Sequence, residues 1–234
     1  HALELAKRKF MPDFDTPDLR LKATEWAAGQ AVSINAALKS VGIDGEVINV
    51  GSELLESAIT LAKASPKVMG GPADLDLIWN AAHLTGARLC IETGVAYGWS
   101  SLAILDAIKN TKGGQLCSID MHYPKKDNEQ FVGIVVPPML RENWDLIRQP
   151  DRNGIKKALN NIGGKIDFCH YDSDKSWWGR AYAFPILWDA LKPGGIFISD
   201  DIQDNLFFRK FAKSKGNPFA VTKSNGKFIG IIRK

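Results

Sequence analysis

Apolar positions along the chain change their spacing repeatedly, and each change marks a predicted structural element. The stretch from residue 89 to residue 105 begins as a continuous apolar run, passes through a turn at Gly94 and Gly98, and continues with helical spacing. A short buried run, a glycine turn and an amphipathic segment are typical of a parallel strand that leads into a helix. In an open parallel sheet such a turn lies at the carboxyl end of a strand, where ligands bind. The stretch therefore predicts a cofactor site.

The alternation of strand and helix continues to the end of the chain. Between the last two apolar runs lies Ser224-Asn225-Gly226, a strong signal for an antiparallel hairpin. The predicted fold class is α/β: a Rossmann-like, doubly wound, mostly parallel seven-stranded sheet that ends in this hairpin. Residues 122–138 show no period and carry three prolines, which predicts a long loop near the site. The predicted strands are 87–93, 115–121, 144–148, 165–171, 196–199, 219–222 and 227–232, and the predicted helices are 73–85, 101–109, 154–162, 178–191 and 206–213, with a helical turn at 138–143.

Residues 1–66 are predicted to form an N-terminal helical extension ahead of the main domain, residues 67–234. Apolar residues recur at helical spacing from Leu19 to Leu38 and again from Leu54 to Ala64, and Pro66 stops the second helix. Such an extension can cover the cofactor, join two copies of the chain, or simply pack on the domain. The sequence does not choose among these roles.

Composition restricts the compartment and the partners. The net charge of +4 arises from 30 basic and 26 acidic residues, and the longest basic run covers only residues 7–9, so we expect no nucleic-acid partner. No apolar run approaches the roughly 18 residues of a membrane span and no leader precedes the fold, so we expect a cytoplasmic protein that binds no membrane. Cys90, Cys117 and Cys169 each lie in an apolar strand-like run, which favours buried free thiols over disulfides or a cysteine metal site.

The turn itself discriminates between cofactors. Ala96 stands where the dinucleotide motif G-x-G-x-x-G has the glycine that brings the backbone against a pyrophosphate, which disfavours an NAD-dependent oxidoreductase. A looser turn suffices for a cofactor without a pyrophosphate, because the helix N-terminus and the Ser100 hydroxyl can hold a single carboxylate. Asp120, at the end of the second strand, is placed to accept hydrogen bonds from ribose hydroxyls. An amino acid joined to a nucleoside fits both positions.

Three segments in their order and spacing, E-T-G-V-A-Y-G-W-S-S, S-I-D-M and L-K-P-G-G, resemble the class I S-adenosylmethionine (SAM)-dependent methyltransferases over residues 67–234. The resemblance implies SAM as the cofactor, with Glu92 and the turn glycines around its methionine end and Asp120 on its ribose. Plainer interpretations stay open for Glu92, as a surface carboxylate at a strand end, and for Asp151, near the position of the adenine, as a turn-forming residue. The predicted cofactor-binding residues are Gly70, Glu92, Gly94, Gly98, Trp99, Ser100, Asp120, Met121 and Asp151.

Acidic residues gather after the fourth and fifth predicted strands. Asp172 and Asp174 follow the fourth strand, and Asp200 and Asp201 follow the fifth. Because these strands are expected to be neighbours, four carboxylates would emerge at one edge of the sheet and repel one another. A hard divalent cation with oxygen ligands would relieve this repulsion. The alternative is that Asp174 and Asp201 only cap the helices that follow them.

D-S-D before an aromatic helix, then K-P-G-G and a strand ending in D-D, resembles the metal-dependent O-methyltransferases, including the catechol type and those that modify sugars. The resemblance implies Asp172, Asp200 and Asp201 as ligands of a divalent cation, Mg²⁺, and Asp174 or Lys175 as the general base. Coordination to a cation lowers the pKa of an acceptor hydroxyl, and a nearby carboxylate or amine then takes the proton.

The roles of two tryptophans and one histidine near the acidic residues can be interpreted in more than one way. Trp177 and Trp178 could wall an acceptor pocket, with core packing favoured for at least one of them. His170 lies inside an apolar strand, which favours a hydrogen-bonded core histidine over a base.

The sequence thus predicts a SAM-dependent methyltransferase that methylates the hydroxyl of a small sugar or phenol with the help of a divalent cation. Two alternatives stay open: a metal-independent O- or N-methyltransferase that uses Asp174 or Lys175, and a noncatalytic nucleotide-binding subunit. The expected partner is a small-molecule acceptor, and a second copy of the chain, joined through the N-terminal helices, is an open alternative.

Overall fold

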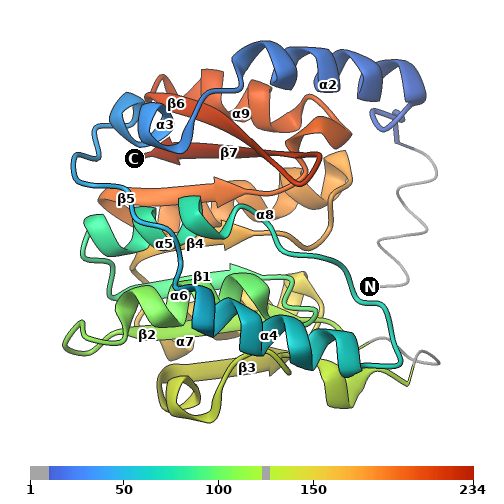
Figure 1. Cartoon of the computed structure of the whole chain (residues 1–234). Helices are drawn as coiled ribbons and strands as arrows, with labels where there is room; N and C mark the ends of the chain where they lie inside the picture. Colours follow the sequence, from blue (N-terminus) through green and yellow to red (C-terminus); the bar gives the residue numbers. More distant parts are fainter. Residues whose placement is uncertain (1–10, 123–126) are drawn as a thin grey trace.

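A seven-stranded sheet forms the centre of the computed structural model, which describes residues 11–122 and 127–234 (Figure 1). The strands lie in the order β3-β2-β1-β4-β5-β7-β6; neighbours among the first five pair in parallel, and β7 pairs antiparallel with both β5 and β6. The predicted fold class is confirmed. The strand bounds are β1 (Leu89–Thr93), β2 (Gln115–Asp120), β3 (Trp144–Arg148), β4 (Ile166–Tyr171), β5 (Leu191–Ser199), β6 (Phe219–Ser224) and β7 (Lys227–Arg233).

Helices cover both faces of the sheet, as in a doubly wound fold (Figure 1). Each face has its own apolar core: Ile104 of α6 belongs to one, and Ile155 of α7 belongs to the other. On the first side lie α5 (Leu75–Leu84) and α6 (Trp99–Ile108), and on the second α7 (Asp151–Asn161), α8 (Trp177–Ala190) and α9 (Phe207–Lys215). The described residues also form α4 (Ser52–Ala64) and the short 3₁₀ helices η1 (Glu129–Phe131), η2 (Pro138–Asn143) and η3 (Ile202–Asp204).

The helix predicted between residues 19 and 38 is two helices in the structure, α2 (Pro17–Gln30) and α3 (Ile34–Ser40). Between them the backbone N–H of Val32 donates a hydrogen bond of 2.9 Å to the carbonyl oxygen of Val221 in β6. Pairing with the edge strand therefore interrupts the helix, which a helical spacing of apolar residues cannot reveal.

The N-terminal helices share the cores of the main domain. Ala27 of α2 packs in the core beside α7 to α9, whereas Ala37 of α3 and Ala58 of α4 pack in the core beside α5 and α6. The boundary between an extension and a domain at residue 66 stays a prediction.

β5 begins at Leu191 rather than at Ile196, although the glycines that precede Ile196 predict a turn. Gly194 N donates to Lys234 O at 2.7 Å, and Lys234 N donates to Gly195 O at 2.9 Å. The last residue of the chain thus extends the pairing of β5 beyond the stretch that its own sequence predicts.

The predicted loop 122–138 contacts the glycine turn, although its residues 123–126 lie outside the described residues. Gly133 N donates to Ala96 O at 2.9 Å, and Val135 N donates to Tyr97 O at 3.1 Å. Residues of this loop are therefore hydrogen-bonded to the glycine turn between β1 and α6.

The three cysteines are free and buried in the sheet, as predicted. Cys90 and Cys169 lie on neighbouring strands, and burial raises the pKa of both thiols. Within the described ranges, no helix has the length and apolar character needed to cross a membrane.

Candidate cofactor and acceptor site

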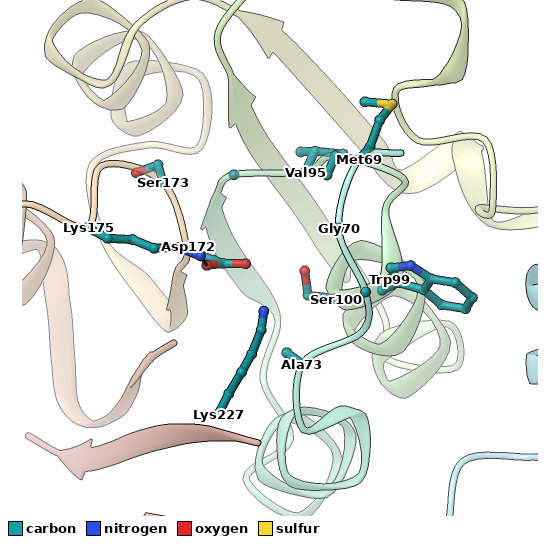
Figure 2. A pocket seen from close by; sticks show the side chains of 13 residues that line it. Met69, Gly70, Ala73, Val95, Trp99, Ser100, Asp172, Ser173, Lys175 and Lys227 are labelled. Atoms are coloured by element: carbon teal, nitrogen blue, oxygen red, sulfur yellow. Dashed lines mark ion pairs between the residues drawn. The ribbon is translucent and has the colours of Figure 1, made fainter. Parts of the chain in front are cut away.

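A pocket of about 230 Å³ opens at the carboxyl ends of β1 and β4, where the glycine turn faces the loop after β4 (Figure 2). Its walls come from the loop before α5, the turn between β1 and α6, the loop after β4 and the start of β7. The sequence-predicted site residues that line it are Gly70, Gly94, Trp99, Ser100, Asp172 and Lys175. The fold thus brings the predicted cofactor turn and part of the predicted acidic cluster into one space.

Gly94 is required because the turn runs directly against the loop after β4. Its φ is +82°, and a Cβ built on it would lie 2.2 Å from the carbonyl oxygen of Asp172. The backbone N–H of Asp172 also donates to Thr93 O at 2.8 Å, which fixes the two strand ends side by side. A side chain at position 94 would force them apart.

The first turn of α6 presents polar groups to the pocket. Gly98, with φ +93°, precedes the helix, and Trp99 and Ser100 of the first turn line the pocket. Trp99 Nε1 is buried and has no hydrogen-bond partner among the described residues, so it can donate to a ligand. The positive end of the helix and this free donor both suit a negatively charged or oxygen-rich ligand.

Asp120 supports the turn from the end of β2. The residue is 3% exposed, and its Oδ2 lies 3.4 Å from Arg148 Nη1. Burial raises the pKa of Asp120, although the hydrogen bond from Ala96 N and the charge of Arg148 act to lower it. The side chain is positioned at the end of its strand as predicted, although it is not part of the pocket wall.

Glu92 is completely buried, so the interpretation of this residue as a surface carboxylate is wrong. Its Oε2 accepts hydrogen bonds from Ser118 Oγ at 2.7 Å and from Ser101 Oγ. These bonds join β1, β2 and α6 behind the pocket. Glu92 therefore acts on the site through the position of the turn.

His170 lies between two buried carboxylates, which confirms that it is a hydrogen-bonded core histidine. Its Nε2 is 3.2 Å from Asp200 Oδ1, and its Nδ1 is 3.6 Å from Glu92 Oε1. Burial alone would lower the pKa of His170, but the hydrogen bonds and charges of Asp200 and Glu92 outweigh it and raise the pKa to about 10. His170 is thus positively charged at neutral pH and neutralises part of the buried negative charge.

Lys175 bridges two of the predicted acidic residues. Its Nζ lies 3.0 Å from Asp172 Oδ1 and also pairs with Asp201 Oδ2. Burial opposes the charge on Lys175, but the two carboxylates raise its pKa above the usual range. Burial likewise opposes the charge on Asp201, yet the bond to Lys175 lowers the pKa of Asp201. Burial and the nearby charge of Asp200 raise the pKa of Asp172 to about 6.

Asp174 contacts the start of α8 instead of lining the pocket. Its Oδ1 accepts hydrogen bonds from Ser176 Oγ at 2.6 Å and from Ser176 N at 3.2 Å, and Ser176 in turn caps α8 through Gly179 N. Asp174 thus bonds to the cap residue of α8 and is not itself the cap, so the capping alternative is wrong for Asp174. Asp201 makes no side-chain cap to the helix that follows it, so for Asp201 this alternative is wrong.

Asp151 and Met121 lie beside the pocket. Asp151 begins α7, and its Oδ2 accepts a hydrogen bond of 2.6 Å from Ser173 Oγ in the loop after β4. Met121 follows β2 and is partly buried. Together with Glu92, Gly98 and Asp120, these two residues are not part of the pocket wall, so their direct contact with a cofactor stays a prediction.

Basic side chains already contact the three predicted metal ligands. Asp200 Oδ1 contacts His170, and Asp200 Oδ2 has no hydrogen-bond partner among the described residues, whereas Asp172 and Asp201 are both paired with Lys175. In the part of the chain that the structure describes, no group of three or more His, Cys, Asp or Glu residues is arranged to hold a metal ion. This arrangement does not support the metal prediction, which stays open to direct measurement.

Two positively charged residues at the site are missed by the sequence patterns. Lys227 begins β7 and lines the pocket, with its Nζ 3.8 Å from Asp201 Oδ2. Arg180 is completely buried in α8, and its Nη2 donates to Asp201 O at 2.7 Å and to Asp200 O at 3.2 Å. The only sequence signal for Arg180 is that a charged residue stands within an apolar helix. The hairpin turn predicts that Lys227 begins the last strand, but it does not indicate that Lys227 lies near Asp201.

Trp177 and Trp178 contact the N-terminal segment and do not line the described pocket. The ring of Phe14 stacks on Trp177 with centroids 4.5 Å apart, and Trp178 Nε1 donates to Pro12 O at 3.3 Å. Trp177 also packs edge-to-face on Phe207. Packing is the role that the structure gives to both indoles.

The comparisons with known proteins agree with this geometry. Residues 91–202, which include the glycine turn and both acidic loops, match the family model described as a methyltransferase domain. No curated protein matches the chain significantly.

Solved structures share the fold at low sequence identity. An O-methyltransferase from Bacillus cereus, solved in complex with SAH, is 16% identical, with a TM-score of 0.60 over 89% of this chain and 100% of its own. The O-methyltransferase TomG from Streptomyces achromogenes, involved in tomaymycin synthesis and solved with SAM, is 14% identical, with a TM-score of 0.60 over 89% and 98%. The SAH-bound methyltransferase PaMTH1 from Podospora anserina is 14% identical, with a TM-score of 0.57 over 96% and 98%.

Residues 91–202 thus match a methyltransferase domain, and the chain shares the fold of O-methyltransferases solved with SAM or SAH. The acceptor and the need for a metal are not decided by these similarities.

Proposed function

We propose that the protein transfers a methyl group from SAM to the hydroxyl of a small acceptor, such as a sugar or a phenol. The observation that carries this proposal is the position of Trp99 and Ser100 opposite Asp172 and Lys175 in one pocket (Figure 2). One side offers a helix N-terminus to a cofactor, and the other offers charged groups to an acceptor.

The cofactor would occupy the side formed by the turn and the loop before α5. Gly70 and Gly94 allow a close approach to the backbone, and Ser100 Oγ and Trp99 Nε1 are donors for the amino-acid end. Asp120 would accept from the ribose. When bound, SAM supplies an electrophilic methyl group on its sulfonium.

Asp172 and Lys175 would act on the acceptor hydroxyl. Lys175 is already an ammonium paired with two carboxylates, so it donates a hydrogen bond to the acceptor oxygen instead of removing its proton. Asp172 is the lining carboxylate that takes the proton as the new bond between oxygen and the methyl carbon forms. The electron pair of the broken carbon–sulfur bond goes to sulfur. Asp174, which bonds to Ser176 before α8, is not the base in this proposal.

Calorimetry with S-adenosylhomocysteine (SAH) tests the cofactor. We expect binding in the micromolar range, and no binding at high micromolar concentration would refute the proposal. Transfer from labelled SAM to a panel of sugars, phenols and amines then tests the acceptor. Transfer only to amines would favour N-methylation, whereas SAH binding without transfer to any acceptor would favour a noncatalytic nucleotide-binding subunit.

A further inference from the structure

We infer that the Lys175 ammonium takes the place of a divalent cation at the ends of β4 and β5, so that Asp172 and Asp201 bind a metal ion only when Lys175 is removed. The catalytic meaning of this inference rests on the proposed function. The expectation that the variant without Lys175 binds a metal ion rests only on the positions of the side chains.

The ammonium lies where the two strand ends converge. Lys175 Nζ is 3.0 Å from Asp172 Oδ1 and is paired with Asp201 Oδ2. Figure 2 shows the Lys175 side chain extended to the Asp172 carboxylate at the pocket wall, with Lys227 directed to the same space from β7. A cation that joined the ends of β4 and β5 would have to use the carboxylates that Lys175 already joins.

Backbone contacts hold both aspartates in place independently of the lysine. Asp201 has a left-handed φ of +49°, and its carbonyl oxygen accepts a hydrogen bond of 2.7 Å from the buried Arg180. Asp172 N is bonded to Thr93 O, and Gly94 packs against the Asp172 carbonyl. A strained conformation of a residue other than glycine persists only where surrounding contacts enforce it. Removal of the Lys175 side chain should therefore leave both aspartates at the ends of β4 and β5, where one added cation can reach the two carboxylates.

Cationic side chains already lie beside these carboxylates. Lys227 Nζ lies 3.8 Å from Asp201 Oδ2, and His170 is hydrogen-bonded to Asp200. A divalent ion added to this group would be repelled by the ammonium groups and would have to displace Lys175 from partly buried partners. The wild-type site therefore disfavours a metal ion.

An ammonium in this position has a donor left for the acceptor. An –NH₃⁺ group carries three N–H donors: one bonds Asp201 Oδ2, and Asp172 Oδ1 lies 3.0 Å from Nζ as an ion-pair partner. A remaining donor can bond the acceptor oxygen, so Lys175 would position the hydroxyl that a metal ion would otherwise coordinate.

Titration with Mn²⁺, followed by electron paramagnetic resonance, tests the inference on the full chain. We expect no bound Mn²⁺ for the wild type at about 1 mM. We expect Lys175→Ala to bind the ion at least about tenfold more tightly than the wild type. Lys223→Ala, which removes an ammonium from the same hairpin as Lys227, is the matched control and should behave as the wild type. Asp172→Asn combined with Lys175→Ala should abolish the new binding.

Two results would overturn the inference. One is Mn²⁺ bound by the wild type and lost in Asp172→Asn; the other is a Lys175→Ala protein that unfolds cooperatively like the wild type and yet gains no Mn²⁺ site. SAH binding measured in the same wild-type sample keeps the two proposals apart, because its absence refutes the proposed function whatever the Mn²⁺ result.

Discussion

The backbone N–H of Ala96 donates a hydrogen bond of 3.0 Å to Asp120 Oδ2 and so ties the turn after β1 to the end of β2. Ala96 has φ +49°, in the left-handed region that favours glycine. The turn therefore keeps the conformation of a glycine turn without a glycine at this position.

Ala96→Gly should stabilise the protein. The left-handed conformation costs an alanine about 1 kcal/mol relative to glycine, so we expect the free energy of unfolding to rise by about that amount. Urea denaturation followed by circular dichroism measures the change. If Ala96→Gly instead lowered the free energy of unfolding, the left-handed conformation would not strain Ala96.

Asp120→Ala should weaken SAH binding. The variant loses the bond to Ala96 N and, by the proposed function, the ribose contact, so we expect an affinity lower by roughly 10-fold to 100-fold. Calorimetry with SAH measures it. Glu142→Gln, an exposed change outside the site, is the control. Unchanged affinity in Asp120→Ala would exclude the ribose contact.

Gly94→Ala should be far more harmful than Gly163→Ala. The two glycines have similar φ values, +82° and +85°, but a Cβ at position 94 would lie 2.2 Å from Asp172 O, whereas a Cβ at position 163 meets no atom within 4 Å. We expect Gly94→Ala to lose about 3 kcal/mol or more and to lose SAH binding, and Gly163→Ala to lose only the cost of the backbone strain. Similar denaturation midpoints for the two variants would contradict the close approach of the strand ends.

His170→Gln should destabilise the protein by about 3–5 kcal/mol near neutral pH, because Glu92 and Asp200 would stay buried without the positive charge. The pKa of His170 is raised from 6.5 to about 10 by folding, so its contribution to stability is complete below pH 6.5 and is lost as the pH rises through 10.

The difference in unfolding free energy between the wild type and His170→Gln should therefore shrink from pH 6.5 to pH 10. Denaturant titrations at several pH values measure this difference. His83→Gln, at an exposed position of α5, is the control. A difference that is constant over this range would show that His170 is neutral in the folded protein.

The native protein should not react with an aromatic disulfide reagent, and all three thiols should react after unfolding. Cys90, Cys117 and Cys169 are buried in the sheet, and burial raises the pKa of each thiol. Absorbance of the released thiolate counts the reactive groups. Rapid reaction of one thiol in the native protein would show that its strand opens locally.

The candidate site could be predicted from the sequence as far as local patterns extend. Gly94, Ser100 and Asp172 are found in the pocket because each immediately follows a buried strand or begins a helix, and parallel strand ends meet at one edge. Asp174 is equally close in the sequence but bonds to Ser176, the N-cap residue of α8, since a side chain in the loop after a strand can bond forward to the start of the next helix.

The sequence by itself determined the order of strands and helices, the hairpin and the place of the cofactor turn, because hydrophobic periodicity and glycine conformation are local properties. The tertiary structure alone decided the break between α2 and α3 at β6 and the pairing of His170 with Asp200. It also decided the bridge that Lys175 forms to Asp172 and Asp201. These contacts join residues on different elements, so the partner of each charge depends on which strand ends the folded chain places together.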